Sequence, residues 1–221
     1  MRIVEAVGAS GELRDLLERR VDELIAYQSH SYALDYAEFV ARVLRREPVA
    51  GRTDLAESVA RHLFKLMAYK DEYEVARLHR DPVEQARLEA EFGAGAKVRY
   101  KLHPPALRAM GMQRKITVGP AFTSLRRLRR LRGTKLDPFG YARVRRVERA
   151  LPAAYRAIVE RALERAGSAD YALLVELCDL PDLVRGYEDI KLASVERFHA
   201  RAAELLERIE TAPALTVIKR G

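Results

Sequence analysis

The sequence predicts a mainly α-helical protein, a multi-helix domain with one small two-stranded β-hairpin. Its 221 residues are 48% hydrophobic and 33% charged, a balance typical of soluble globular chains rather than of disordered ones. The abundant Ala, Leu, Glu and Arg residues favour helix. Apolar residues recur at three- and four-residue steps over most of the chain, and strict alternation is confined to one stretch near residue 100. We expect residues 1–221 to form a single domain.

The N-terminal part, residues 10–92, is predicted to be helical. An apolar stripe at three- and four-residue steps indicates a helix over residues 11–46. The polar stretch 28–31 bends this helix or splits it. Pro48 and Gly51 mark its end.

A second helix is predicted from Thr53 or Asp54 to about His79. Acidic residues in its first turn are favoured there by the helix dipole. The segment Asp81-Pro82-Val83-Glu84 then combines a capping residue, a proline at the first helical position and a capping-box glutamate. It predicts a short helix that ends near Phe92.

The segment 64–78 is dense in polar groups although it lies on a helix that must also be buried. Lys70 and Glu74 are four residues apart, as are Tyr73 and Arg77, so we expect these pairs along one helix face. Two interpretations remain open. The segment is either a helix with ion pairs of its own or a polar seam against another domain.

The middle part, residues 96–135, is strongly basic. Apolar and basic residues alternate over 98–102, which predicts a β-strand, and residues 113–118 are the candidate partner that closes the hairpin. Such a hairpin is marginal alone and must pack on the helices. An Arg-rich helix is predicted from about Phe122 to Arg132, followed by a loop rich in Gly and Pro.

The C-terminal part, residues 138–211, is again predicted to be helical. The periodicity of its apolar residues indicates three helices, over about 141–165, 170–178 and 189–209. Pro152 interrupts or kinks the first of them. Ser168 or Asp170 starts the second.

Positive charge is concentrated in residues 97–149, which contain sixteen Lys and Arg against two acids, a net charge of +14. The rest of the chain has 24 basic and 30 acidic residues, a net charge of −6. Such a basic insert indicates an anionic partner or a phosphate-bearing ligand. The alternative is a solvated helix whose arginines pair with acids of the same chain. The candidate anion-binding residues are Arg126, Arg127, Arg129, Arg130, Arg132 and Lys135.

The sequence contains no catalytic motif. Cys178 is the only cysteine, so the chain cannot form an internal disulfide or hold an iron–sulfur cluster by itself. The five histidines lack metal-ligand spacing. No apolar run approaches the ~20 residues of a membrane helix, and Glu5 stands where a signal peptide would be apolar. We therefore expect a cytoplasmic chain with no metal site and no catalytic residue.

Five separated segments carry recognisable motifs. The longest reads KLMAYKDEYEVARL over residues 65–78. The others are residues 24–28, 131–141, 148–151 and 183–191. In order and spacing, these segments resemble the C-terminal region of the indolepyruvate ferredoxin oxidoreductase family. The resemblance covers roughly residues 10–210, and the chain departs from the family pattern in residues 103–120, which are shorter and more basic.

The resemblance implies a place in a larger redox enzyme. The family oxidatively decarboxylates 2-oxo acids, typically aryl pyruvates, to acyl-CoA while it reduces ferredoxin. Its thiamine diphosphate and iron–sulfur clusters lie in other domains, and no catalytic residue is assigned to the matched region. The chain is then expected to be inactive alone and to hold no cofactor. The motif residues expected at an interdomain contact or in a structural role are Lys70, Asp71, Glu72, Tyr73, Glu74 and Arg77.

Three functional hypotheses follow. The first is an accessory domain, or a separately encoded subunit, whose basic insert faces ferredoxin or the phosphates of coenzyme A, beside the catalytic domains of the same enzyme. The second is a stand-alone helical protein that binds nucleic acid or another polyanion. The third is a structural dimerisation module.

Overall fold

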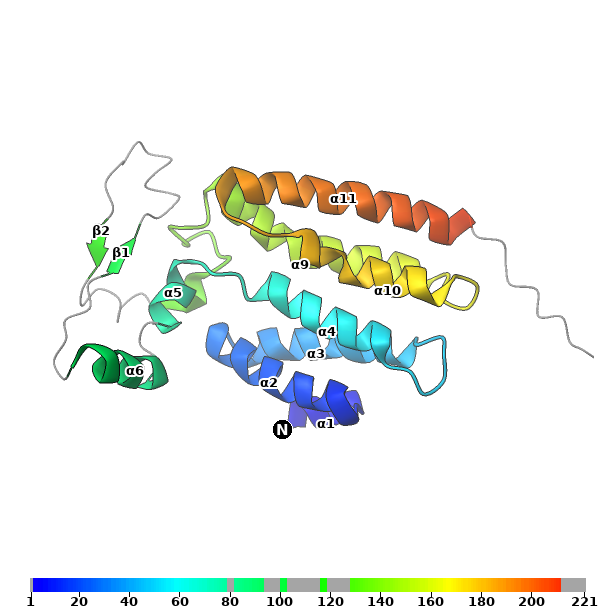
Figure 1. Ribbon diagram of the computed structural model, residues 1–221, viewed down its shortest axis with the longest axis horizontal. Helices are drawn as coiled ribbons and strands as arrows, with labels where there is room; N and C mark the ends of the chain where they lie inside the picture. The colour runs from blue at the N-terminus through cyan, green and yellow to red at the C-terminus, as the bar shows by residue number, and fades with distance from the viewer. Residues whose placement is uncertain (1, 79–81, 94–99, 103–115, 119–127, 212–221) are drawn as a thin grey trace, which may run out of the picture.

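The apolar stripes of the sequence become helices whose apolar faces meet in one core. In the computed structural model, the described residues are 2–78, 82–93, 100–102, 116–118 and 128–211. Their elements are mostly helices, so the predicted mainly helical class is confirmed (Figure 1). Within these ranges, no helix is long and apolar enough to cross a lipid bilayer.

The N-terminal layer contains three helices, α1 (Arg2–Val7), α2 (Gly11–Tyr27) and α3 (His30–Arg45). The predicted helix over 11–46 is split at residues 28 and 29. Ser29 caps α3, since its hydroxyl oxygen accepts a hydrogen bond from the backbone N–H of Tyr32 at 3.2 Å. Helix α1 was not predicted from the sequence, because its six residues are too few to show helical periodicity.

The predicted helix from Thr53 to His79 is wrong, because two helices occupy this stretch. They are α4 (Asp54–Met67) and α5 (Glu72–Leu78), separated by residues 68–71. Asp71 starts the second, since its Oδ1 accepts a hydrogen bond from the backbone N–H of Glu74 at 2.9 Å. A short helix, α6 (Pro82–Phe92), follows as predicted.

The basic middle part is described only at three places. Strands β1 (Tyr100–Leu102) and β2 (Ile116–Val118) pair antiparallel, with Lys101 opposite Thr117. The connection between them lies outside the described residues, as does most of the predicted Arg-rich helix. The described end of that helix is a single 3₁₀ turn, η1 (Leu128–Leu131).

The C-terminal helices lie close to their predicted positions. They are α9 (Arg143–Leu163), α10 (Tyr171–Asp179) and α11 (Glu188–Thr211), with the 3₁₀ turn η2 (Leu180–Leu183) between the last two. α9 continues through Pro152. Asp170 caps α10, since its carboxylate accepts a hydrogen bond from the backbone N–H of Ala172 at 2.9 Å.

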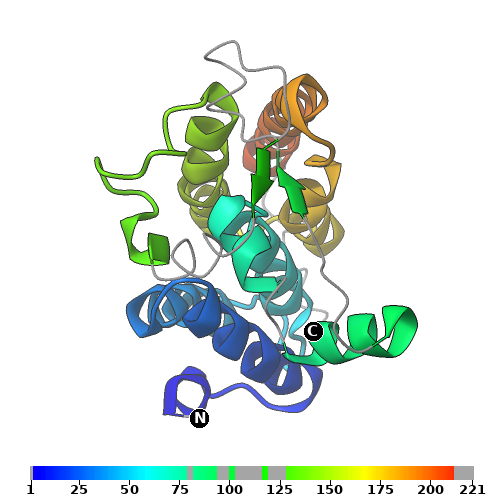
Figure 2. The same ribbon diagram turned by 90° about the vertical axis from the view of Figure 1, so that its left-hand side faces the viewer.

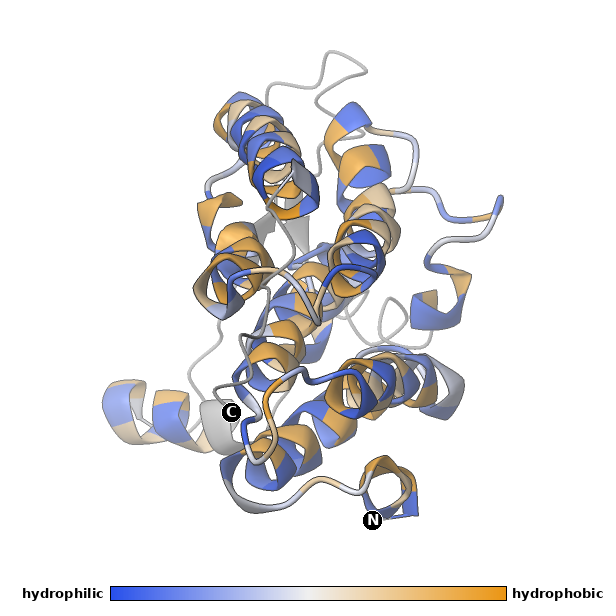
Figure 3. Ribbon diagram, turned by 90° about the vertical axis from the view of Figure 1, so that its right-hand side faces the viewer, coloured by the Kyte–Doolittle hydropathy of each residue, from blue (hydrophilic) through white to orange (hydrophobic). Residues whose placement is uncertain are grey.

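The core lies between two layers of helices. Helix α4 packs against α2 and α3 on one side and against α9 and α10 on the other, while α11 covers α9 and α10 (Figure 1). Figure 3 shows the apolar faces of these helices turned toward one another. The hydroxyls of buried tyrosines donate hydrogen bonds to backbone oxygens. Tyr36 donates to the oxygen of Ala60 at 2.8 Å, and Tyr155 donates to the oxygen of Cys178 at 2.6 Å. Such pairing removes most of the cost of burying a polar group.

Candidate functional site

Charged side chains are buried together at one end of the bundle. We call this end the polar end and define it as residues 68–78, 128–149 and 183–191. It includes α5, the loop before α9, and the first turns of α9 and α11, all on the left of Figure 1. Figure 2 looks onto this end, with α5 in the centre of the view. A polar cluster inside a helical bundle needs a physical explanation, because buried charges are costly unless they are paired.

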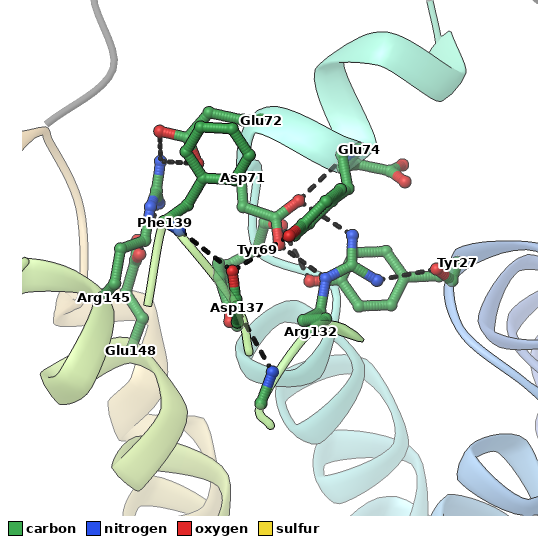
Figure 4. A network of polar contacts seen from close by, with 12 residues as sticks. Tyr27, Tyr69, Asp71, Glu72, Glu74, Arg132, Asp137, Phe139, Arg145 and Glu148 are labelled. Atoms are coloured by element: carbon green, nitrogen blue, oxygen red, sulfur yellow. Dashed lines mark hydrogen bonds and ion pairs between the residues drawn. The ribbon is translucent and has the colours of Figure 1, made fainter. Parts of the chain in front are cut away.

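Arg132 and Asp71 form the innermost pair. Arg132 Nε donates to Asp71 Oδ2 at 2.5 Å and Nη2 donates to Oδ1 at 2.8 Å, and both residues are almost completely buried (Figure 4). Nη1 donates to the backbone oxygen of Tyr27 at 2.7 Å, and the guanidinium lies 3.6 Å from the centre of the Tyr27 ring. Burial lowers the pKa of Arg132, but its hydrogen bonds to Asp71 outweigh burial and raise it, so the group stays charged.

Asp137 organises the loop between η1 and α9. Its carboxylate accepts hydrogen bonds from the backbone N–H groups of Gly133 and Phe139, at 3.2 and 3.0 Å. It also accepts from the Tyr73 hydroxyl at 3.0 Å and pairs with Arg149. One buried carboxylate therefore ties the loop both to α5 and to α9 (Figure 4).

A second group of ion pairs joins α5, α9 and α11. Arg145 Nη1 donates to Glu148 Oε2 at 2.6 Å, and Nη2 lies 3.4 Å from the carboxylate of Glu72. Lys191 Nζ donates to the other oxygen of Glu148 at 2.5 Å. Burial raises the pKa of Glu72, and the nearby Arg145 opposes this shift without cancelling it. These contacts fix the first turns of α9 and α11 relative to α5.

The expected pairs Lys70–Glu74 and Tyr73–Arg77 are wrong. Lys70 precedes α5, which begins only at Glu72, so the four-residue helical spacing from Lys70 does not exist. Glu74 pairs instead with Arg77, which donates to it through Nε at 2.8 Å and Nη2 at 2.6 Å. The hydroxyl of Tyr73 donates a hydrogen bond to Asp137 rather than contacting Arg77. Of the six motif residues, Asp71, Glu72, Tyr73 and Glu74 are buried, whereas Lys70 is exposed.

Four of the six predicted anion-binding residues are described, and they differ in exposure. Arg126 and Arg127 lie outside the described residues. Arg130 and Lys135 are exposed and Arg129 is half-buried. The interpretation of Arg132 as an external anion-binding residue is wrong, because Asp71 and the Tyr27 backbone already occupy its buried guanidinium.

The partners of this network were not predicted as site residues from the sequence. The missed residues are Tyr27, Asp137, Arg145, Glu148, Arg149 and Lys191. Five of the six fall inside the segments that resemble the oxidoreductase family. Their place in these segments was the one feature of the sequence that could have indicated them as site residues. Arg145, which lies between two such segments, had no such feature.

The described residues do not assemble a recognisable reaction centre. Within the described ranges, no group of three or more His, Cys, Asp or Glu side chains is placed to hold a metal ion. His62 and Ser58 both contact Asp179 Oδ1, at 3.1 and 2.5 Å. This arrangement differs from a nucleophile–base–acid chain, in which the histidine contacts both the serine and the acid.

The surface of the polar end is both apolar and cationic. Of the nine large apolar side chains that are exposed in the described ranges, six belong to this end. Tyr187 and Leu136 are the most exposed, at 79% and 75%. The six are Leu128, Leu136, Tyr141, Leu183, Tyr187 and Ile190. Exposed aromatic and aliphatic side chains beside arginines are typical of protein interfaces.

Fold and network together define a helical bundle whose one end is organised by buried ion pairs. Over residues 13–204, the chain matches the family described as a family of unknown function (DUF6537), and it belongs to this family. A search of the curated proteins and a search of the solved structures gave no match.

Proposed function

We propose that the chain is an accessory, non-catalytic domain or subunit of an indolepyruvate ferredoxin oxidoreductase-like enzyme, and that the polar end is its docking surface for an acidic partner. In such an enzyme an aryl 2-oxo acid is oxidatively decarboxylated to acyl-CoA and ferredoxin is reduced. Thiamine diphosphate and the iron–sulfur clusters belong to other domains. The chain contributes binding and orientation.

One observation carries the proposal. The five segments that resemble the oxidoreductase family are distributed over residues 24–191, yet all of them have residues at or beside the polar end. Tyr27 accepts from Arg132, Arg132 pairs with Asp71, and Glu148 pairs with Lys191. A core needs only apolar side chains of the right volume. Convergence of polar motif residues supports a shared task at this end rather than general stability.

The exposed groups favour an acidic protein partner. The exposed Arg130 and Lys135 lie in the same stretch as the exposed side chains of Leu136 and Tyr141. Apolar anchors surrounded by cations give affinity together with electrostatic steering toward a negative surface. Ferredoxin is the expected partner, because it is the usual electron acceptor in the family that the chain resembles. The phosphates of coenzyme A are the other candidate ligand for the same cations.

The test is binding of the full chain to a purified acidic ferredoxin, measured by calorimetry at several salt concentrations. Affinity should fall at least about tenfold between low salt and ~0.5 M NaCl, because the Debye length shrinks to a few ångström. The triple variant Arg129→Ser, Arg130→Ser and Lys135→Ser should bind about five- to tenfold more weakly.

The matched control substitutes Arg45, Arg197 and Arg208 by Ser. These residues are exposed, as Arg130 and Lys135 are, and they lie outside the polar end. The control should bind like the unaltered chain. Salt-independent binding, or equal weakening by both triple variants, contradicts the proposal. A shift of short duplex DNA at low salt that depends on the same three residues of the polar end would instead favour the polyanion-binding alternative.

A further inference from the structure

A cleft of about 250 Å³ opens at the polar end between the end of α4, residues 68–70 and the loop before α11. Its lining includes three buried apolar side chains, Leu66, Leu151 and Val184. At roughly 30 Å³ for each water molecule, the cleft has room for about eight waters. It is therefore large enough for a small organic molecule and smaller than most drug-sized pockets.

The lining carries an excess of positive charge. Four cationic side chains face one acid, Glu148. Glu148 accepts from Lys191 at 2.5 Å, so this cation is already paired. The four cationic residues are Lys65, Lys70, Arg185 and Lys191.

A second carboxylate, Asp182, contacts two of these cations from beside the cleft. Its Oδ1 accepts from Lys65 at 3.1 Å, and its Oδ2 lies 3.3 Å from Arg185. The acids Glu148 and Asp182 thus neutralise two of the four charges, while Arg145 and Glu72 next to them balance each other. The four lining cations and Arg145 therefore exceed the three acids Glu148, Asp182 and Glu72 by two charges. Lys70 is exposed and has no ion pair within the described part of the chain.

The backbone at the rim of the cleft has an uncommon conformation. Gly186 has φ +90°, and a Cβ there would meet Ile190 Cγ2 at 2.6 Å. Glu188, with φ +50°, is the one residue other than glycine with positive φ in the described ranges. This turn starts α11 directly after the lining residue Tyr187. The first turn of α11 carries two acids, Glu188 and Asp189, which offset the positive end of the helix, so the positive potential of the cleft comes from its side chains.

We propose that this cleft binds a small phosphomonoester. The phosphoryl group would lie among Lys70, Lys191 and Arg185, and the organic part would lie on the apolar lining. A phosphomonoester carries about −1.5 to −2 charges at pH 7, which matches the excess of two positive charges, whereas a monocarboxylate leaves half of it unbalanced. Lysines bind phosphate as point charges without needing the fixed fork geometry of arginine. The cleft lies within the polar end, but Arg129, Arg130 and Lys135 do not line it, so phosphate binding is tested apart from docking.

The test is calorimetric titration of the full chain with phenyl phosphate, inorganic phosphate and benzoate. Phenyl phosphate should bind most tightly, because it alone supplies both the dianion and an apolar body. Lys70→Gln should weaken its binding about tenfold, since one charge-assisted contact is lost. Arg185→Gln should weaken it several-fold. Arg208→Gln, a change at an exposed cation outside the polar end, should leave the affinity unchanged.

Lowering the pH below about 6 should also weaken binding, because the phosphoryl group takes up its second proton there. Circular dichroism of each variant verifies that the fold is kept, and Lys70→Gln removes no ion pair within the described residues. No binding of phenyl phosphate at millimolar concentration would overturn the proposal. So would equal affinity for benzoate, or unchanged affinity in both Lys70→Gln and Arg185→Gln. Ferredoxin binding by Lys135→Gln separates this result from the docking proposal, since Lys135 belongs to the docking residues and does not line the cleft.

Discussion

Arg132 and Asp71, which are 61 residues apart, bind each other through two parallel hydrogen bonds of 2.5 and 2.8 Å in the interior of the polar end. Asp71 at the same time accepts from the N–H of Glu74 and so starts α5. One carboxylate therefore serves as a helix cap and as the counter-ion of a buried arginine. The start of α5 and the position of η1 depend on the same pair.

Removing the charged group of one partner, Arg132, should strongly destabilise the folded protein. Arg132→Met leaves the Asp71 carboxylate buried without its counter-ion, so we expect the free energy of unfolding to fall by about 3–5 kcal/mol. Urea unfolding followed by circular dichroism measures this change. Arg14→Met, which breaks the exposed pair with Glu18, should cost less than about 1 kcal/mol. If the free energy of unfolding of Arg132→Met falls by less than about 1 kcal/mol, the buried pair is not needed for stability.

Gly140 makes the loop before α9 sensitive to a single methyl group. A Cβ at this position would overlap the Arg149 guanidinium, which pairs with Asp137. Gly140→Ala should therefore displace Arg149 and cost about 1–3 kcal/mol, because Asp137 loses a charge-assisted contact while its three neutral donors, Tyr73, Gly133 and Phe139, remain.

Gly167→Ala is the matched control, since a Cβ there meets nothing within 4 Å and its φ is not positive. This change should be neutral or stabilising by a few tenths of a kcal/mol. Both variants are compared by thermal and urea unfolding. Equal stabilities would mean that the Arg149–Asp137 pair relaxes freely around the new methyl group.

The extent to which the sequence predicts this structure depends on how far apart the interacting residues are. Helix stripes such as that of α2 depend on local periodicity and were predicted correctly. The break at residues 68–71 was not, because Asp71 and Tyr73 have the composition of a solvent-facing helix. Their burial is favourable only because Arg132 and Asp137, more than 60 residues away, complete their hydrogen bonds.

The Arg-rich run shows the same limit for the candidate site. Arg130 and Arg132 are identical in type and lie two residues apart, so local sequence patterns treat them alike. Only the tertiary fold makes one exposed and the other buried against Asp71. The position of the family-like segments was a better guide to the network than the charge density was.

The pH dependence of stability should contain a contribution from His62. Burial lowers the pKa of His62, and the nearby Asp179 and Asp182 only partly offset this effect, while Lys65 adds to it. The folded state therefore binds its proton less readily than the unfolded state, whose pKa is about 6.5. This histidine costs no stability well above that pH, and stability is lost as the pH falls below about 6.5 toward the folded-state pKa.

Urea unfolding of the unaltered chain and of His62→Gln between pH 5 and 8 isolates this contribution. The unaltered chain should lose more stability on acidification than the variant does. Glu72, whose raised pKa contributes with the opposite sign in acid, is common to both proteins and cancels in the difference. His199→Gln, at an exposed position, should reproduce the unaltered profile. Parallel profiles for the unaltered chain and His62→Gln would contradict the assignment.

Cys178 should be chemically inert while the protein is folded. The thiol lies in the core on α10, and burial raises its pKa far above the usual range, with Asp179 adding to the shift. Because the thiolate is the reactive form, an aromatic disulfide reagent should label almost none of the native protein. In concentrated guanidinium it should label one thiol per chain. Arg132→Met should react faster than the unaltered chain if labelling proceeds through global unfolding, since the unfolded population rises as the free energy of unfolding falls. Rapid labelling of the unaltered native protein would instead show that α10 opens locally, without loss of the polar end.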